Sequence, residues 1–334
     1  MRMIDFVIAL GDLMMPRACL ACGRRLGMRE RHLCLSCAAD VPYTRFWLAP
    51  HNPLADRFNA VLERHRGTEP MDYAYAAALI YYKGAYRSIP RALKYQGDLA
   101  AGRHYGALLG RRLAAAPHFA DIDLVIPVPL HWTRLRSRGY NQAEILARAL
   151  VDAFRSAPST VIPGLTRNLP EVRTDLLVRA RRTRTQTRVS VDQKAQNVAS
   201  AFQVPARFSL WARAIRRLSH IFSFDSARWP IKVGHDGDDS SGRVLSLARD
   251  APESPAEVLA SARHILLVDD TFTTGATLYA CYAALRPFTT ARISIATLAA
   301  VEGTPSLEGP PSGTGGMPSS PGDTSLPSAP SDGP

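Results

Sequence analysis

The sequence lacks the marks of several large protein classes. Nowhere in its 334 residues is there a run of roughly 18–20 uncharged apolar residues, the length that a membrane-spanning helix needs. It holds no G-x-x-x-x-G-K-[ST] phosphate loop, and no G-x-G-x-x-G follows a predicted strand, which disfavours an ordinary NTPase and a dinucleotide-dependent oxidoreductase. The apolar run near the N-terminus is interrupted by Asp5 and Asp12 and lacks a small-residue cleavage site. We therefore expect a short amphipathic helix there instead of a signal peptide, and a cytoplasmic protein.

Negative charge is scarce relative to positive charge. The chain has 29 Asp and Glu against 41 Lys and Arg, a formal net charge of +12. Residues 301–334 hold four acidic residues and no Lys or Arg, so residues 1–300 carry +16. A body this basic favours polyanionic partners, namely phosphorylated small molecules, nucleic acid or an acidic membrane surface, and charge alone does not choose among them. The 46% of hydrophobic residues is typical of a globular protein with a buried core.

Cysteine is sparse as well, but its placement is informative. Four of the five cysteines form two Cys-x2-Cys pairs separated by eleven residues. Each two-residue gap lets one tight turn direct both sulfurs at a single ion, and two such turns complete a tetrahedral Zn–S4 site. The predicted zinc ligands are Cys19, Cys22, Cys34 and Cys37. Two disulfides in a secreted protein are the disfavoured alternative. We expect His32 to be a bystander of the metal and Cys281 to be a buried core residue.

Apolar runs and turn residues alternate along the chain in the manner of an α/β protein. Strands are predicted at 73–82, 123–129, 264–270 and 292–299, and helices around 85–95, 98–116, 141–154 and 276–286. A basic loop is expected directly after the strand at 123–129. The order strand, turn, helix, strand at the C-terminal end predicts a parallel pair with a right-handed crossover. The expected fold class is thus α/β, a parallel sheet with flanking helices, preceded by a small N-terminal zinc ribbon.

The same pattern divides the chain into regions. The division is 1–48 for the leading helix and double zinc ribbon, 49–72 for an irregular linker, 73–300 for the α/β domain and 301–334 for a disordered tail rich in Pro, Gly and Ser. Residues 155–172 and 207–258 fit the scheme poorly and are predicted to be insertions. The second contains a basic amphipathic helix, which we expect to cover its own domain, the alternative being a membrane surface or a partner.

The strongest functional signal is the segment ILLVDDTFTTGAT at 265–277. A buried strand delivers Asp269 and Asp270 to the carboxyl edge of a sheet, and a loop of hydroxylated residues then leads into a helix N-terminus. Backbone amides, the helix dipole and threonine hydroxyls make an anion cradle there. Carboxylates accept hydrogen bonds from vicinal hydroxyls of a sugar. The segment therefore predicts a pocket for ribose 5-phosphate, against the alternative that the strand merely ends in acidic residues and a turn.

This segment is similar to the phosphoribosyl-diphosphate signature of type I phosphoribosyltransferases. Together with PVPLHWTRLRSRGYNQA (127–143), LKYQGD (93–98) and the two Cys-x2-Cys pairs, it resembles the ComF family of competence-associated proteins. The resemblance covers most of 15–154, 173–206 and 259–300. It implies a double zinc ribbon fused to a type I phosphoribosyltransferase-like domain, with a role in DNA uptake.

The resemblance also implies roles for individual residues. Asp269 and Asp270 would bind the ribose hydroxyls, directly or through Mg2+. Binding of phosphoribosyl diphosphate would fall to Thr271, Thr273, Thr274, Gly275, Ala276, Thr277, Pro129 and Leu130. Arg138 is expected to contact the diphosphate, because a guanidinium fork matches phosphate oxygens.

Residues 179–198 occupy the place of a mobile basic lid, with a solvated loop or a nucleic-acid contact as the alternatives. The lid residues would be Arg182, Arg184, Gln186 and Lys194. Two positions depart from the family pattern: Lys194 stands where an Arg is common, and Thr271 where an apolar residue is common.

Two functions remain open from the sequence. One is an active phosphoribosyltransferase, in which Mg2+ and the basic lid stabilise the departing diphosphate while a nitrogen nucleophile, unknown from the sequence, attacks the ribose. The other is a non-enzymatic competence module that contacts single-stranded DNA or a helicase and keeps the fold without the activity. The expected partners are accordingly phosphoribosyl diphosphate or a related nucleotide, single-stranded DNA and a competence helicase.

Overall fold

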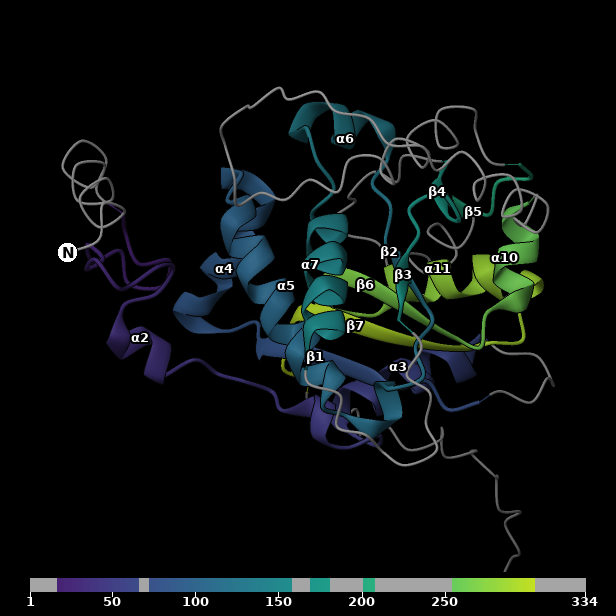
Figure 1. Cartoon of the computed structure of the whole chain (residues 1–334), viewed down its shortest axis with the longest axis horizontal. Helices are drawn as coiled ribbons and strands as arrows, with labels where there is room; N and C mark the ends of the chain where they lie inside the picture. The colour runs from purple at the N-terminus through teal and green to yellow at the C-terminus, as the bar shows by residue number, and fades with distance from the viewer. Residues whose placement is uncertain (1–16, 66–71, 158–168, 181–200, 208–253, 304–334) are drawn as a thin grey trace, which may run out of the picture. The chain divides into compact units, whose positions relative to one another are not determined.

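A parallel sheet of five strands forms the centre of the protein (Figure 1). The computed structural model describes residues 17–65, 72–157, 169–180, 201–207 and 254–303. The strands are β1 (Ala76–Tyr81), β2 (Leu124–Pro127), β3 (Glu171–Val172), β6 (His264–Phe272) and β7 (Arg292–Ala300), in the spatial order β1-β7-β6-β2-β3. All four pairings are parallel, as the sequence predicts. β4 (Val178–Arg179) and β5 (Phe202–Gln203) make a separate antiparallel pair.

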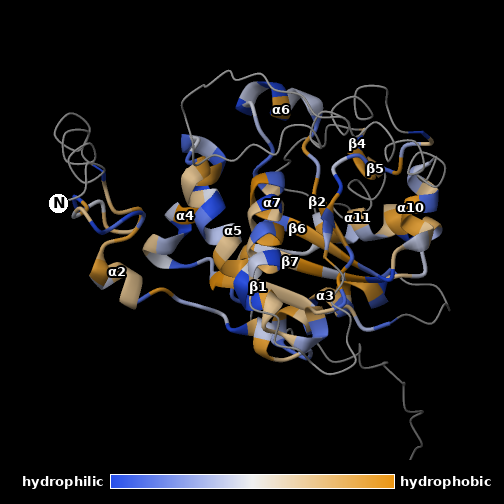
Figure 2. Ribbon diagram, in the orientation of Figure 1, coloured by the Kyte–Doolittle hydropathy of each residue, from blue (hydrophilic) through white to orange (hydrophobic). Residues whose placement is uncertain are grey.

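Helices cover both faces of this sheet. Side chains of the buried strand β6 alternate, so that Leu266 and Val268 pack on one side while Ile265 and Leu267 pack on the other. The first side carries α5 (Leu99–Ala114) and α7 (Gln142–Ser156), and the second carries α3 (Pro53–Arg64), α10 (Pro255–Ser261) and α11 (Ala276–Leu285). Figure 2 shows the strands as mostly apolar and the helices as two-sided. The predicted α/β architecture is therefore confirmed.

Short elements connect these layers. They are α2 (Leu35–Ala39), η1 (Phe46–Leu48), η2 (Gly84–Arg87), α4 (Ser88–Arg91), the π-helix η3 (Ala92–Gln96), η4 (Pro117–Phe119), α6 (Trp132–Arg138) and η5 (Arg286–Phe288). No helix in the described ranges has both the length and the apolar character that crossing a membrane requires.

Three glycines let α5 and α7 approach one another closely. A Cβ atom on Gly106 would lie 2.8 Å from the backbone oxygen of Leu146, and one on Gly110 would lie 2.1 Å from that of Leu150. Gly102 continues the stripe one turn earlier, against Leu93. The backbones of the two helices are thus in contact at Gly106 and Gly110, where no larger residue fits without moving a helix.

The linker expected at 49–72 is not irregular throughout, because half of it forms α3. The Asn52 side chain accepts hydrogen bonds from the amides of Leu54 and Ala55, which caps the helix, and Pro53 occupies its first position. Leu54, Ala55, Phe58 and Leu62 are then buried against the sheet. Pro53, which suggested a break in the chain, is instead part of the start signal of a helix.

Other local expectations are also corrected. The basic loop expected after β2 contains the helix α6, capped by His131. The predicted insertions overlap with ordered elements, since β3 lies at 171–172 and α10 begins at Pro255. The leading helix within 1–16, the amphipathic helix predicted after residue 207 and the tail beyond residue 303 lie outside the described residues.

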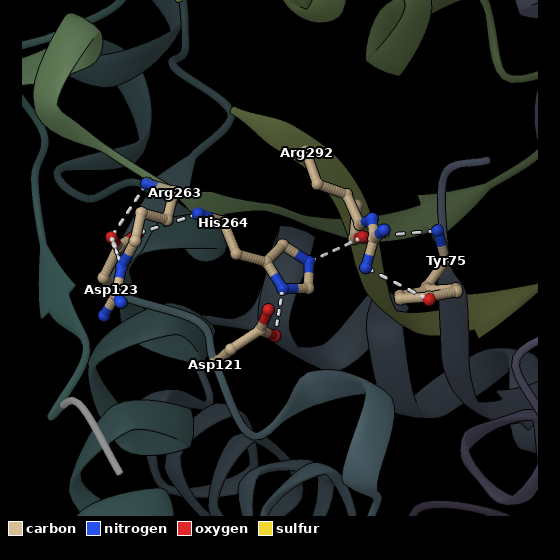
Figure 3. A network of polar contacts seen from close by, with 7 residues as sticks. Tyr75, Asp121, Asp123, Arg263, His264 and Arg292 are labelled. Carbon is tan, nitrogen blue, oxygen red and sulfur yellow. Dashed lines mark hydrogen bonds and ion pairs between the residues drawn. The ribbon is translucent and has the colours of Figure 1, made fainter. Parts of the chain in front are cut away.

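A polar network fixes the amino ends of the strands (Figure 3). The fully buried His264 has its Nδ1 2.6 Å from Asp121 Oδ1 and its Nε2 2.8 Å from the hydroxyl of Ser294. The Tyr75 amide donates to the same hydroxyl at 3.2 Å, and Arg292 donates to the Tyr75 hydroxyl at 3.1 Å. Ser, His and Asp in this order resemble a hydrolase triad, but Ser294 and His264 are both inaccessible. The network therefore holds β6 and β7 to their neighbours, with its serine and histidine enclosed by the fold.

Candidate functional site

The four predicted zinc ligands come together in the structure. Their Sγ atoms all lie within 4.8 Å of one another, and those of Cys22 and Cys34 are 3.8 Å apart. Tetrahedral zinc with Zn–S bonds of about 2.3 Å requires S···S separations of about 3.8 Å. Among the described residues this is the one cluster of metal-ligating side chains. The four-cysteine set therefore fits a structural zinc ion.

Backbone amides favour the thiolate form of Cys19. Burial opposes the thiolate of Cys19, but hydrogen bonds from the amides of Cys22, Cys34 and Ala21 outweigh it and lower the pKa of Cys19 to about 6. Because zinc binds thiolate and not thiol, a lowered pKa favours metal loading near neutral pH.

The segment that carries the cysteines rests on the sheet domain at several points. The hydroxyl of Tyr86 in η2 donates to the carbonyl of Cys37 at 2.9 Å, and Tyr43 bridges to Ile80 at the end of β1. His32 lies outside the cysteine cluster, with its Nδ1 3.9 Å from Asp98. His32 is thus a contact between the two parts, in agreement with its expected place outside the metal site.

A cavity of about 680 Å³ opens at the carboxyl ends of β2 and β6. In a parallel α/β sheet this is the edge where ligands bind. Its walls are Tyr82, Pro90, Arg91, Lys94, Tyr95, Gln96, Val128, Pro129, Leu130, Arg134, Gln142, Arg179, Asp269, Asp270, Thr271, Thr273 and Thr277. The structure thus brings together seven of the residues singled out for phosphoribosyl-diphosphate binding and catalysis, from two distant segments of the chain.

The acidic pair lines the floor of this cavity. Asp270 is only 2% exposed and its Oδ1 lies 2.7 Å from the ammonium of Lys94, while Asp269 is partly exposed and accepts the amide of Asp270 at 2.8 Å. Burial and the charge of Asp270 raise the pKa of Asp269 to about 7, although Lys94 opposes this shift. Asp270 Oδ2 and Thr271 Oγ1 are inaccessible to water and find no hydrogen-bond partner among the described residues. Each of these atoms thus lacks the partner that buried polar groups usually have.

The loop after β6 ends at the N-terminus of α11. Gly275 has a φ of +81° at the N-cap, the left-handed conformation that glycine adopts without strain. Arg57 braces the loop by donating to the carbonyls of Thr273 at 2.9 Å and Val301 at 2.6 Å. Of the predicted loop residues, Thr273 and Thr277 line the cavity, whereas Thr274, Gly275 and Ala276 are not among its lining residues.

Positive charge dominates the rest of the wall. Arg91, Lys94, Arg134 and Arg179 line the cavity together with only two acidic residues. Arg138, expected to contact the diphosphate, is not among the lining residues. It donates to the side-chain oxygen of Gln142 at 2.5 Å, and its guanidinium lies 5.8 Å from the ring centroid of Tyr95. Since Gln142 and Tyr95 do line the cavity, Arg138 lies just behind its rim.

Outside the described residues lie the four predicted lid residues, Arg182, Arg184, Gln186 and Lys194. Arg179, at the start of the predicted lid stretch, is described and lines the cavity.

Sequence reasoning missed several lining residues. Lys94 stands in the LKYQGD stretch, which contributed to the resemblance but received no role, and Arg134 stands in the stretch expected to be a basic loop. Tyr82 and Arg91 carried no motif at all. The available signals were the LKYQGD stretch for Lys94 and the PVPLHWTRLRSRGYNQA stretch for Arg134.

A second cavity of about 360 Å³ lies at the C-terminal end of α5. Its walls are Trp47, Leu48, Leu108, Arg111, Arg112, Ala115, Ala116 and Pro117. It contains no acidic or nucleophilic side chain, so the larger cavity is the better candidate for chemistry.

Comparison of the chain with known proteins gives no family assignment: no family model and no curated protein matches it. A functional assignment therefore depends on the fold and on the geometry of the two sites.

Proposed function

We propose that the cavity binds a phosphorylated pentose, with phosphoribosyl diphosphate or a related nucleotide as its ligand. The observation that carries this proposal is the convergence of the acidic pair, Asp269 and Asp270, and the threonines Thr273 and Thr277 on one cavity. Oδ2 of Asp270 is buried without a hydrogen-bond partner among the described residues, which costs free energy of about 1–3 kcal/mol, and a ligand hydroxyl that reaches it after a rotation of the side chain would recover this cost. Vicinal sugar hydroxyls supply such donors without adding charge.

The opposite wall suits the anionic end of the same ligand. Thr273 and Thr277 lie beside the N-terminus of α11, where backbone amides and the helix dipole favour a phosphate. Arg91, Arg134 and Arg179 supply charge for further phosphate oxygens. A sugar with a phosphate at one end and a diphosphate at the other matches this distribution of donors and acceptors.

The transfer reaction that this ligand supports breaks the bond from C1 of ribose to the diphosphate and forms a bond from C1 to a nitrogen nucleophile. The residues of this chain would hold the two hydroxyls and stabilise the charge that develops on the departing diphosphate. Mg2+, when bound with the diphosphate, would supply further charge neutralisation. We propose that the protein is a ComF-like, phosphoribosyltransferase-like protein with a role in DNA uptake.

Calorimetric titration of the full, zinc-loaded chain with phosphoribosyl diphosphate tests the proposal. We expect saturable binding in the presence of Mg2+, and loss of binding when Asp269→Asn and Asp270→Asn are combined. Asp152→Asn, on the exposed side of α7, is the matched control and should bind as the wild type does. No heat from the wild-type protein at ligand concentrations up to about 1 mM, where even weak binding of about −4 kcal/mol registers, overturns the proposal.

One observation favours the alternative of a nucleic-acid contact. Helix α6 exposes Trp132 at 64% and Leu135 at 43%, flanked by Arg134, Arg136 and Arg138. Exposed aromatic and arginine side chains are the usual platform for stacking single-stranded bases. We expect binding of an oligothymidylate to weaken steeply with added salt, and Trp132→Ala to weaken it about tenfold. Fluorescence anisotropy that shows no binding at low salt rejects direct contact with DNA.

A further inference from the structure

An unusual helical turn carries Lys94 into the cavity. Residues Ala92–Gln96 form a π-helix, a rare geometry that occurs mostly as single turns at functional sites. The hydroxyl of Tyr140 donates to the carbonyl of Leu93 within this turn, and Gly97 ends it with a φ of +69°. The turn is thus held from outside by the segment that leads into α7, and its geometry directs Lys94 at the floor of the cavity.

The ion pair that Lys94 makes there is largely withdrawn from water. The side chain of Asp270 is 3% exposed and that of Lys94 is 28% exposed, with 2.7 Å between Nζ and Oδ1. Burial disfavours the charge of Lys94, but attraction to Asp270 and Asp269 outweighs it and raises the pKa of Lys94 above its ordinary value. Lys94 therefore remains a cation at any pH near neutrality. A buried carboxylate without such a partner would be strongly destabilising.

The ion pair limits what else the two carboxylates can bind. Oδ1 of Asp270 is taken by Lys94, and Oδ1 of Asp269 accepts the amide of Asp270. A divalent cation that binds carboxylates needs several oxygen ligands at about 2.0–2.6 Å. At the acidic pair it would sit against the ammonium of Lys94, where like charges repel. Oδ2 of Asp270 is buried and has no hydrogen-bond partner among the described residues, and a neutral hydroxyl donor suits it better than a second cation does.

We propose that Lys94 is the resident cation of the acidic pair, so that Asp269 and Asp270 take sugar hydroxyls directly and exclude divalent metal ions. The ligand in this statement rests on the proposed function, whereas the exclusion of metal does not. Lys94 is a positioning residue, because it acts through Asp270. A metal ion that enters with a diphosphate stays at the diphosphate and does not bridge to the pair.

Titration of the zinc-loaded chain with Mn2+ alone, followed by the electron paramagnetic resonance signal of free Mn2+ at pH 8, tests the exclusion. We expect the wild type and Asp270→Asn to bind Mn2+ equally, because the acidic pair of the wild type holds none. Lys94→Met should bind one Mn2+ at least about tenfold more tightly, because the carboxylate oxygens are then free for a hard cation. Adding Asp270→Asn to Lys94→Met should abolish this gain.

Two matched variants separate the role of Lys94 from a general loss of positive charge. Lys83→Met removes an exposed lysine whose ammonium lies 3.6 Å from Glu302, and it should create no Mn2+ site. Lys94→Arg keeps the cation and should keep the exclusion. A folded Lys94→Met protein without the new site overturns the proposal. A Mn2+ site in the wild type that Asp270→Asn removes also overturns it. This second measurement does not require the Lys94 variants to fold.

A parallel titration with ribose 5-phosphate in metal-free buffer separates the role of Lys94 from the proposed function. Binding without any divalent ion supports both. Binding that appears only after Mg2+ is added overturns the role of Lys94 and leaves the proposed function standing. No binding under either condition speaks against the proposed function, while the Mn2+ result continues to decide the exclusion.

Discussion

The cysteine cluster and the cavity are built in opposite ways. The cluster takes all four ligands from one short segment, Cys19 to Cys37, and the apolar residues buried with it are few. The cavity takes its walls from residues spread between Tyr82 and Thr277, held by the sheet and its two large apolar clusters. A zinc ion held by the four cysteines would supply the folding free energy of the first region, whereas side-chain packing supplies that of the second. The two regions should therefore fail under different perturbations.

Substitution of one cysteine of the cluster should give the largest loss of structure, and that loss should be confined to the cysteine segment. Cys34→Ser is expected to lose the bound metal, because structural zinc contributes on the order of 10 kcal/mol to the folding of such a segment. Metal analysis should find zinc in the wild type and not in the variant. Hydrogen exchange should accelerate around Cys19 to Cys37 and stay slow in β6.

Cys281 provides the matched control for this change. It lies fully buried in α11, away from the cluster, and burial raises the pKa of its thiol well above the ordinary value. The Cys281→Ala variant should retain zinc at the four-cysteine cluster and have a lower free energy of unfolding than the wild type. Faster exchange throughout β6 in Cys34→Ser would contradict the independence of the two regions.

A clash between α5 and α7 should produce the reverse pattern. In Gly110→Ala the new Cβ would lie 2.1 Å from the backbone oxygen of Leu150, so the helices must separate. We expect a loss of about 3 kcal/mol or more in the free energy of unfolding, with the zinc retained. Denaturant unfolding measures the loss. Arg103→Ala, at an exposed position of the same helix, should change stability by less than about 0.5 kcal/mol. Equal stability of Gly110→Ala and wild type would show that the helices are not in contact there.

The same contrast explains which features the sequence could predict. The four-cysteine cluster follows from spacing alone, and β6 and β7 follow from runs rich in β-branched and apolar residues. Helix α3 was missed because Pro53 signals a helix start as readily as a chain break, and Gly67 and Pro70 favoured the break. The partner of Asp270 could not be predicted, since Lys94 lies 176 residues away and reaches it only through a π-helical turn. Sites built from residues close in the sequence can be predicted from the sequence, whereas contacts across the sheet depend on tertiary packing.

The pH dependence of ligand binding at the cavity should give a smaller effect than the two preceding changes. Burial and the charge of Asp270 raise the pKa of Asp269 to about 7, so the free protein holds a proton there below that pH. Hydroxyl donors prefer the ionised carboxylate. Affinity for ribose 5-phosphate should therefore rise with pH, by up to about tenfold per unit below pH 7, and level off above it.

Asp269→Asn separates this titration from that of the ligand, whose phosphate also ionises near pH 6. The variant should bind more weakly and keep only the pH dependence of the phosphate. Isothermal titration between pH 5.5 and about 8.5 gives both profiles. An unchanged profile in the variant would remove Asp269 from the binding of the hydroxyls.

The smallest expected effect concerns the sheet edge opposite the cavity. The hydrogen bond to His264 lowers the pKa of Asp121 below its ordinary value of 3.8, although partial burial opposes the shift. A lowered pKa stabilises the folded state above the unfolded pKa, and that contribution disappears as the pH falls through the folded one. Asp121 is half exposed, so we expect less than about 1 kcal/mol. Urea unfolding should show Asp121→Asn less stable than wild type at pH 6, with the difference shrinking below pH 4. Zinc release in acid affects both proteins alike. A difference that stays constant with pH would mean that Asp121 supports His264 by shape and not by charge.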